Sequence, residues 1–503
     1  MDVILAGIAE ALTLANMAFI ALGVFTGIVF GAIPGLNGPM AIAIALPLTF
    51  AFSPLTAIAF LVGINKGANY GGSISAVLLN VPGTAEAMAT TFDGYPLAQQ
   101  GKPLKALKMS LYASVFGDTF SDLILILVAA PFAVIALKMG PAEITALLLF
   151  ALTFIAAVVG RSMLRGLVAA AFGMLLATVG LDTEASTPRM TFGLNELEDG
   201  IPLLALVIGA LALSEVLIQV ETYARTGRSE AASVNPFARD VPRENRVVTR
   251  AEFTGCMRTL VRSALIGTAI GAIPGLGSTL AGFLGYAMAK RASKNPETFG
   301  TGNPEGIAAA EAANSATVGA NLIPTLSLAI PGNLSAAVLM SALIVHGLTP
   351  GPLIFEQHGK VLYGLFAAML VANAITLAVG AVGLRFFAFV VSLPARYIHP
   401  ALVLLCICGA FLLEQSLFAV GLMLGFALLG YVMRKLDFSV VAFLIAFILG
   451  PLFEDALRQT MVLFRDNPQG LLQRPIAMVF VALTAWSVWR LGFRARPEIL
   501  REK

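Results

Sequence analysis

Two long stretches of the chain lack charged residues, and the same short phrase interrupts the apolar pattern twice. Residues 11–65 and 312–355 contain no Asp, Glu, Lys or Arg. A membrane-spanning helix needs about 20 apolar residues, so each stretch is long enough to cross a membrane, turn and return. The phrase Gly-Ala-Ile-Pro-Gly-Leu stands at residues 31–36 and again at residues 271–276. The pattern predicts a bundle of membrane helices with breaks inside it.

Each copy of the phrase predicts a broken helix. Proline removes a backbone donor and the following glycine loosens the chain, so polar backbone groups are left facing the protein interior. Transporters hold their cargo at such breaks. A kink where small residues pack two helices together is the alternative, but the repetition favours the first interpretation. The positions that define the predicted breaks are Gly31, Pro34, Gly35, Asn37, Gly271, Pro274 and Gly275.

A second interruption accompanies each phrase. Residues 65–75 place amides, hydroxyls and glycines in an apolar context, and Pro82-Gly83 breaks the chain soon afterwards. Asn314 and Pro331-Gly332 repeat this arrangement with the same spacing. We predict two re-entrant hairpins, whose exposed carbonyl groups and helix N-termini would hold a cation and a carboxylate. A polar seam between two packed helices is the alternative.

The composition places the chain among all-α polytopic membrane proteins, with about a dozen spans. Hydrophobic residues make up 58% of the chain and charged residues 12%, and the mean hydropathy is +0.87. These values exclude a soluble multidomain protein. The net charge of +3 is too small to indicate nucleic-acid binding. The three cysteines and three histidines are too scattered for a disulfide framework or a metal site.

The two halves of the chain are predicted to be inverted repeats. The basic turn at Arg161 aligns with an acidic turn at Glu414, whereas the acidic loop at Asp182 aligns with the basic pair Arg434-Lys435. Since basic loops stay in the cytoplasm, equivalent loops then lie on opposite faces of the membrane. The predicted parts are a first repeat, a cytoplasmic linker, a second repeat, and an extra helix with a basic tail, at residues 1–220, 221–262, 263–474 and 475–503.

The same rule sets the predicted orientation of the ends. The first residues include Asp2 and Glu10 and lack the basic region of a cleaved signal peptide, so we expect the N-terminus to be periplasmic. The arginine-rich C-terminal tail is expected in the cytoplasm.

Three charged residues interrupt apolar segments and have open interpretations. Lys66 is costly at membrane depth, so it needs a partner or a water-filled cavity, unless it is an anchor at the cytoplasmic rim. Asp118 and Asp122 are four residues apart and share one face of a helix. They could serve ion coupling, or they could cap or pack against a loop.

The motifs together resemble those of the large membrane subunit of tripartite tricarboxylate transporters, the TctA family. The resemblance runs over nearly the whole chain. The segments that carry it are residues 31–39 and 271–277, the Asn-Lys-Gly-Ala-Asn-Tyr-Gly-Gly-Ser segment at 65–73, the tip at 80–84, and Ile-Pro-Gly at 330–332.

This resemblance implies a permease subunit of a secondary transporter that imports di- or tricarboxylates together with Na⁺ or H⁺. It also implies two protein partners, a small membrane subunit and a periplasmic solute-binding protein, and a location in the bacterial inner membrane. No cofactor is expected, unless Na⁺ serves as the coupling ion. The sequence does not identify the acid.

The residue pattern distinguishes three classes of function, namely a secondary transporter, a channel or uniporter, and a membrane enzyme. A channel or uniporter for small organic anions is the alternative, but two inverted halves favour alternating access. An enzyme would need a nucleophile with a base, or a metal cluster, and the sequence contains no such grouping and no phosphate-binding loop. We therefore expect a transporter and no catalytic residues.

The candidate site combines the two predicted hairpins. Helix N-termini, amides and hydroxyls would hold the carboxylate, because neither hairpin contains arginine. The predicted substrate-binding residues are Ser73, Ser75, Pro82, Gly83, Thr84, Asn314, Pro331, Gly332 and Asn333, and the candidates for ion coupling are Asn65, Asn69, Asn314 and Asp118.

Overall fold

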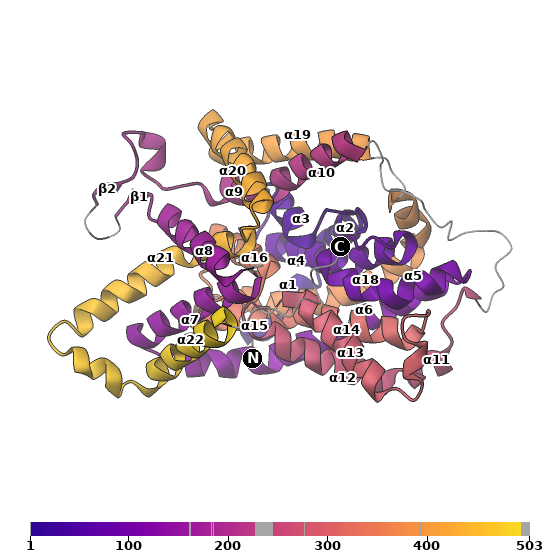
Figure 1. Ribbon diagram of the computed structural model, residues 1–503. Coiled ribbons are helices and arrows are strands. Elements are labelled where there is room, and N and C mark those ends of the chain that lie inside the picture. Colours follow the sequence, from indigo (N-terminus) through magenta and orange to yellow (C-terminus); the bar gives the residue numbers. More distant parts are fainter. Residues whose placement is uncertain are drawn as a thin grey trace. The chain divides into compact units, whose positions relative to one another are not determined.

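The computed structural model describes residues 2–159, 162–182, 184, 186–226, 245–275, 277–391 and 395–493. Most of these residues are helical (Figure 1), which confirms the predicted all-α class. The helices within this described part that are long and apolar enough to cross a membrane are Leu14–Ala32, Pro103–Ala136, Leu203–Arg225, Gly359–Val391, Leu417–Lys435 and Val440–Leu463. Shorter apolar helices accompany them. The chain is a multi-pass membrane protein.

The chain forms two compact units, of which the first comprises Met1–Ala133 and Leu204–Leu428. It contains segments of both predicted repeats, whose boundaries stay predictions. Its helices in the first part of the sequence are α1 (Asp2–Ala11), α2 (Leu14–Ala32), α3 (Gly38–Ala45), η1 (Leu46–Ala51), α4 (Pro54–Leu79), η2 (Ala85–Thr90), α5 (Thr91–Gln99) and α6 (Pro103–Ala136). Those later in the sequence are α9 (Leu203–Val207), η4 (Ile208–Leu213), α10 (Ser214–Thr226), α11 (Arg250–Gly255), α12 (Met257–Gly271), α13 (Gly277–Ala292), η6 (Pro296–Thr298), α14 (Pro304–Ala320), α15 (Leu322–Leu328), α16 (Leu334–Val345), α17 (Ile354–Gln357), α18 (Gly359–Val391), α19 (Ala395–Glu414) and α20 (Leu417–Lys435).

The second unit comprises Val134–Leu203 and Leu429–Lys503. It contains α7 (Pro141–Val159), α8 (Met163–Ala177), η3 (Asn195–Leu197), α21 (Val440–Leu463), η7 (Pro468–Gln473) and α22 (Pro475–Phe493). Strands β1 (Gly180–Leu181) and β2 (Pro188–Arg189) form a short antiparallel pair. Beside it, Arg189 and Arg458 each bind both Asp182 and Glu454, so this loop is tied to α21.

Some predicted features fall on residues that the structure does not describe. Arg161, Leu276, residues 227–244 of the predicted linker and the tail after Phe493 lie outside the described residues. The ends of the predicted linker belong to α10, α11 and α12.

Glycines one helical turn before each repeated phrase bring two pairs of helices into close contact. A Cβ atom added to Gly27 on α2 would lie 2.1 Å from the carbonyl oxygen of Ile64 on α4. A Cβ atom added to Gly267 on α12 would lie 2.1 Å from the carbonyl oxygen of Ala313 on α14. Small residues let helix backbones approach in this way. The helix-packing interpretation therefore applies to the glycines before the Pro-Gly step, including Gly31, which still lies within α2 and packs against Ala68.

The helices end just after these glycines, in matching conformations. α2 ends at Ala32 and α3 begins at Gly38, while α12 ends at Gly271 and α13 begins at Gly277. Between them, Gly35 and Gly275 have φ angles of +86° and +85°. Only glycine adopts this left-handed region without steric cost, which explains its place after both prolines.

The second pair of interruptions also matches. α4 is a single helix of 26 residues, so the polar segment 65–75 lies inside it and the turn comes only at residues 80–84. Asn80 ends α4 with a φ of +57°, and Ala329 ends α15 with the same value. Each tip packs against its own phrase, since a Cβ atom on Gly83 would meet the Gly31 carbonyl and one on Gly332 would meet the Gly271 carbonyl.

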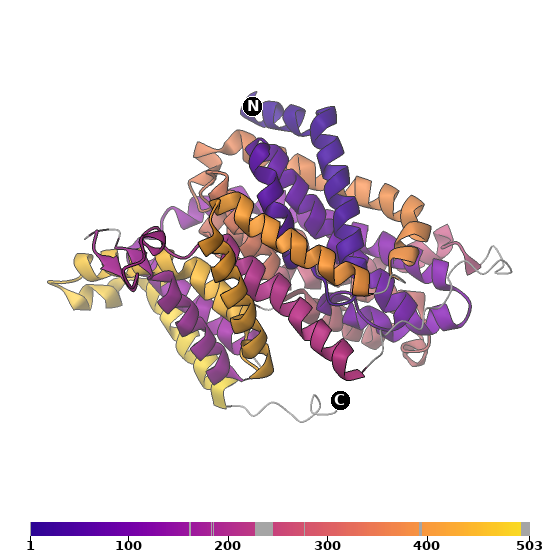
Figure 2. The ribbon, with the colours of Figure 1, turned by 90° about the horizontal axis from the view of Figure 1, so that it is seen from above.

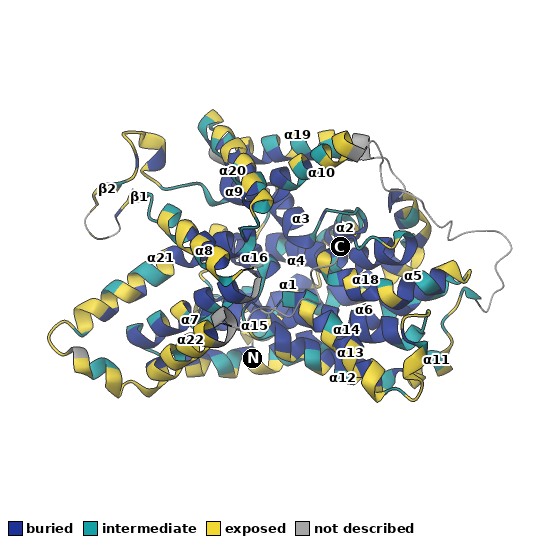
Figure 3. Cartoon of the chain, in the orientation of Figure 1, coloured by how far each residue is buried: buried dark blue, intermediate teal, exposed yellow. Residues whose placement is uncertain are grey.

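Burial is concentrated around these interruptions. α3, α4 and α16 consist mainly of buried residues, shown in dark blue in Figure 3. Figure 2 shows the sharp turn between α1 and α2 at the N-terminal end of the chain. There the Thr13 side chain accepts a hydrogen bond from the Asn16 N–H and caps α2.

Candidate functional site

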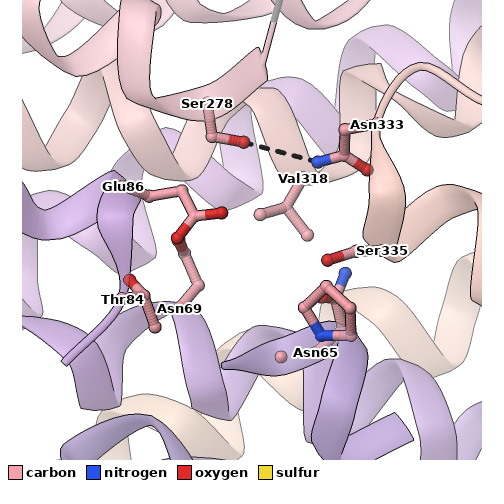
Figure 4. A pocket seen from close by; sticks show the side chains of 10 residues that line it. Asn65, Asn69, Thr84, Glu86, Ser278, Val318, Asn333 and Ser335 are labelled. Carbon is pink, nitrogen blue, oxygen red and sulfur yellow. Dashed lines mark hydrogen bonds between the residues drawn. The ribbon is translucent and has the colours of Figure 1, made fainter. Parts of the chain in front are cut away.

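All four interruptions contribute to one small cavity inside the first unit. Figure 4 shows the side chains of Glu86, Ser278, Asn333 and Ser335 converging on it. The residues that line it are Gly38, Pro39, Asn65, Asn69, Thr84, Glu86, Ser278, Val318, Asn333 and Ser335. They come from the segments that follow the two phrases and the two Pro-Gly tips, and from the middle of α4 and α14.

Three helices begin at this cavity. Gly38 and Pro39 are the first residues of α3, Ser278 is the second residue of α13, and Ser335 is the second residue of α16. A helix N-terminus carries a partial positive charge and presents unpaired N–H groups, so it favours an anion. Neither Lys nor Arg is among the lining residues. Positive potential at the cavity therefore comes from backbone dipoles.

The polar side chains that line the cavity are already engaged in part. Asn333 Oδ1 accepts a hydrogen bond of 2.9 Å from the Ala336 N–H, and Asn333 Nδ2 donates to Ser278 Oγ at 3.5 Å. Asn69 Nδ2 donates to Ser315 Oγ at 2.8 Å. Thr84 Oγ1 is buried and has no hydrogen-bond partner among the described residues. A buried hydroxyl without a partner is costly, so Thr84 is available to a ligand.

The cavity is small. Its volume, counted as the space open to the centre of a water molecule, is about 20 Å³. This is room for a water molecule or a bare cation, and too little for a di- or tricarboxylate. A carboxylate can bind here only if the elements around the cavity move apart.

The structure brings four of the predicted site residues together at the cavity, and the other eight do not line it. Asn65, Asn69, Thr84 and Asn333 line the cavity. Ser75 Oγ donates to the Gly72 carbonyl within α4. The remaining predicted positions that do not line the cavity are Ser73, Pro82, Gly83, Asn314, Pro331, Gly332 and Asp118.

Asn314 occupies the position equivalent to Asn65 but lies deeper. Its side chain is 1% exposed, and neither amide atom has a hydrogen-bond partner among the described residues. Such a group costs about 1–3 kcal/mol when buried. Asn314 is thus a polar group that the surrounding protein leaves unsatisfied.

Lys66 forms a buried ion-pair cluster behind the cavity. Its ammonium nitrogen lies 3.2 Å from Asp118 Oδ1, 2.8 Å from Asp122 Oδ2 and 2.9 Å from Asn373 Oδ1. Lys66 is 1% exposed, which excludes the alternative of an anchor at the rim. The cluster joins α4 to α6 and α18, and Asp118 is already paired within it.

Sequence reasoning missed Glu86, Ser278, Ser335 and Glu311. Ser278 and Ser335 lie directly after the second phrase and the second tip, so the breaks themselves could have indicated them. Glu86 lies on η2, two residues after Thr84 at the end of the first tip. Glu311 precedes Asn314 by one helical turn and is fully buried. A lone acidic residue at membrane depth is the signal that could have found it.

Comparison with known proteins identifies the family. The family model described as "Tripartite tricarboxylate transporter TctA family" matches residues 17–445. The chain belongs to this family. As a TctA-family protein it is a membrane component of a tripartite tricarboxylate transporter, which operates with other components. The match includes every residue that lines the cavity.

Two relatives of this TctA-family chain come from Agrobacterium vitis. The first, described as an uncharacterized 52.8 kDa protein in the TAR-I ttuC' 3' region, is 32% identical over 479 residues, which cover 95% of this chain and 93% of the relative. The second, described as an uncharacterized protein in the TAR-II ttuC' 3' region, is 32% identical over 217 residues, or 43% of this chain and 90% of the relative. No solved structure matches the chain.

Proposed function

We propose that this chain is the permease subunit of a binding-protein-dependent secondary transporter that imports di- or tricarboxylates together with H⁺ or Na⁺. A periplasmic solute-binding protein would deliver the acid, and a small membrane subunit would complete the complex in the bacterial inner membrane. The observation that carries this proposal is the meeting of α3, α13 and α16, by their N-termini, at one buried polar cavity. Half-helix N-termini at the substrate site are characteristic of secondary transporters.

The charges at the cavity support coupling to a cation. The lining residues include one acidic side chain, Glu86, and no basic one. A carboxylate that enters beside ionised Glu86 meets repulsion, which a bound cation or a proton would relieve. Anion and cation should therefore strengthen each other's binding, typically by about 1–3 kcal/mol. Asn65 and Asn69 line the same space, and the oxygen of an amide side chain is a ligand atom of the kind that hard cations prefer.

The small volume of the cavity supports alternating access. A cavity of this size must widen and open to one face to load a carboxylate, and to the other face to unload it. The matching turns at Gly35 and Gly275, and at Asn80 and Ala329, support an internal duplication. In an inverted repeat, the same local motion made by either half opens opposite faces. We propose that the two repeats exchange such conformations around the cavity.

Counterflow in proteoliposomes tests this function. The complete three-component system is reconstituted, loaded with one unlabelled carboxylate from a panel of di- and tricarboxylates, and exposed to the labelled acid outside. A carrier accumulates the label transiently inside the vesicles without an ion gradient. This happens because each outward transport of unlabelled acid is followed by return of the binding site, which then binds labelled acid outside and carries it in. A channel equilibrates the label without overshoot, and that result would exclude the proposal.

A pair of variants links this activity to the cavity. Glu86→Gln should lose most of the stimulation by a cation gradient, because it removes the acidic group from the cavity. The control is Glu196→Gln, an exposed glutamate on η3. Equal gradient dependence in both variants would remove Glu86 from the coupling mechanism.

A further inference from the structure

Glu311 on α14 lies in a closed pocket of hydroxyl groups. Its carboxyl group accepts hydrogen bonds from Ser73 Oγ on α4 at 2.6 Å, from Thr90 Oγ1 on η2, and from Ser114 Oγ on α6 at 2.7 Å. The side chain is completely buried. These hydrogen bonds connect a helix of the second half of the sequence with three elements of the first half.

No cation faces this carboxyl group within the part of the chain that the structure describes. The neighbouring cluster differs in this respect, because Asp118 and Asp122 share the ammonium group of Lys66. Lys66 with these two carboxylates already carries a formal charge of −1, and ionised Glu311 would bring it to −2. An unpaired charge at membrane depth is strongly unfavourable, and proteins usually neutralise it by proton uptake.

The other titratable groups on the surrounding elements do not supply a counter-charge. On α4 the Tyr70 phenol is close enough to Glu311 to interact with it, and Tyr112 on α6 interacts with Tyr70. Asp93 on α5 accepts from Tyr286 on α13 and from backbone N–H groups. The remaining charged groups on these elements are engaged or directed elsewhere. On α6, Lys105 pairs with Glu252, and Lys108 lies six residues before Ser114, or about 9 Å along the helix. Glu86 lines the cavity, Glu305 accepts from Thr259 and Ser293, Arg262 donates to Thr259, and Arg258, Lys290 and Arg291 are exposed.

We propose that Glu311 binds the proton that is transported with the carboxylate. A proton needs no space beyond a hydrogen bond, whereas a sodium ion needs several oxygen ligands around a void. The hydroxyl oxygens of Ser73 and Ser114 already lie at direct hydrogen-bond distance from the carboxyl oxygens, so the pocket is filled. The step adds H⁺ to the carboxylate and gives a neutral carboxylic acid. Release of the proton on the other side of the membrane restores the carboxylate.

The pocket lies one helical turn from the cavity. Ser73 and Asn69 are four residues apart on α4, and Glu311 and Ser315 are four residues apart on α14, or about 6 Å along each helix. Ser73 binds Glu311, and Asn69 binds Ser315 and lines the cavity. Protonation of Glu311 can therefore influence the cavity through two neighbouring contacts between the same two helices. Movement of α4 against α14 would break both contacts and expose Glu311 to water.

The first test does not depend on transport. Infrared spectra of the purified full chain in lipid are recorded over a range of pH, and Glu311→Gln is subtracted from the wild type. The expected difference is one protonated carboxylic acid band, present at neutral pH and absent from the variant. A difference spectrum that contains only ionised carboxylate at neutral pH would overturn the proposal. Glu305→Gln is the control, since this glutamate lies at the first turn of the same helix and should leave the band unchanged.

The second test uses the assembled transporter and rests on the proposed function. Proton entry is measured with a pH-sensitive dye inside proteoliposomes while carboxylate uptake is measured with label. Glu311→Gln should carry one proton fewer per carboxylate and should lose accumulation against a gradient, while counterflow continues. Glu311→Asp, which keeps an ionisable group, should restore proton entry. Unchanged proton entry in Glu311→Gln would contradict the proposal. Absence of counterflow in the wild type would instead contradict the proposed function and leave the infrared result standing.

Discussion

Thr84 and Asn333 occupy equivalent positions in the two halves of the sequence, each directly after a Pro-Gly step, and line the same cavity. Thr84 presents a buried hydroxyl without a partner among the described residues. Asn333 caps α16 and donates a hydrogen bond from its amide to Ser278. Two segments that are far apart in the sequence thus provide polar groups to one space, as expected of a ligand site between duplicated halves.

The first prediction concerns these two residues. Thr84→Val and Asn333→Ala should each raise the KM for carboxylate uptake by roughly 10- to 100-fold, because a hydrogen bond to a charged ligand contributes about 1.5–3 kcal/mol. Initial rates of labelled uptake in proteoliposomes measure the effect. Asn195→Ala is the control, since Asn195 is exposed on η3. If both cavity variants kept the wild-type KM, the polar groups of the cavity would have no part in substrate binding.

A second prediction separates cation binding from folding. Asn65→Ala and Asn314→Ala should lower the apparent cation affinity more than they lower the amount of folded protein. Asn65 lines the cavity, and Asn314 has no partner among the described residues, so removal of either amide costs few protein contacts. Uptake is titrated with the coupling cation at fixed carboxylate concentration. Unchanged ion dependence in both variants would return these asparagines to a role in helix packing.

The third prediction concerns the stability of the Lys66 cluster. Lys66→Met leaves Asp118 and Asp122 without their cation and should destabilise the protein by about 3–5 kcal/mol, whereas Lys66→Met combined with Asp122→Asn should recover part of the loss. Thermal unfolding in detergent is the measurement. Lys360→Met is the control, because the exposed pair between Lys360 and Glu10 should contribute less than about 1 kcal/mol. Equal losses of stability in Lys66→Met and Lys360→Met would contradict the burial of the Lys66 cluster.

A fourth prediction tests the glycine contacts. Gly27→Leu and Gly267→Leu would force a side chain against the backbone of α4 or α14, and should abolish most of the folded protein. Gly421→Leu, where a side chain meets nothing within 4 Å, should leave the amount of protein unchanged. Fluorescence size-exclusion profiles of tagged variants give the result. Normal profiles for both Gly27→Leu and Gly267→Leu would contradict the close approach of α2 to α4 and of α12 to α14.

The fifth prediction is the topology. Cysteines at Asn195 and at Arg239, which lies outside the described residues, should be labelled from opposite sides of the membrane. The ion pairs of Arg189 and Arg458 with Asp182 and Glu454 support the same side for the acidic loop and the second half of α21. Cys256, Cys406 and exposed Cys408 must first be replaced. Labelling of both positions only from the cytoplasm would contradict the inverted repeats.

The sequence predicted those features that depend on local chemistry. The Pro-Gly steps indicated where helices end, and the repeated phrases indicated which interruptions are equivalent, so Asn65, Asn69, Thr84 and Asn333 could be named in advance. The partners of buried charges depend on helix packing, which local patterns do not determine. Lys66 could therefore not be assigned to Asp118 and Asp122, and Glu311 received no role until Ser73, Thr90 and Ser114 were found around it.

We propose that the four interruptions form the carboxylate site. The most direct test is ligand protection of a cysteine at Ser335, in the first turn of α16 and on the cavity wall, in a chain without the three native cysteines. Labelling of this cysteine should slow only when the transported carboxylate and the coupling cation are present together. A cysteine at Asn195 should react at one rate throughout. Labelling at Ser335 that is equally fast with and without both ligands, in protein that still performs counterflow, would show that the carboxylate does not bind at this cavity.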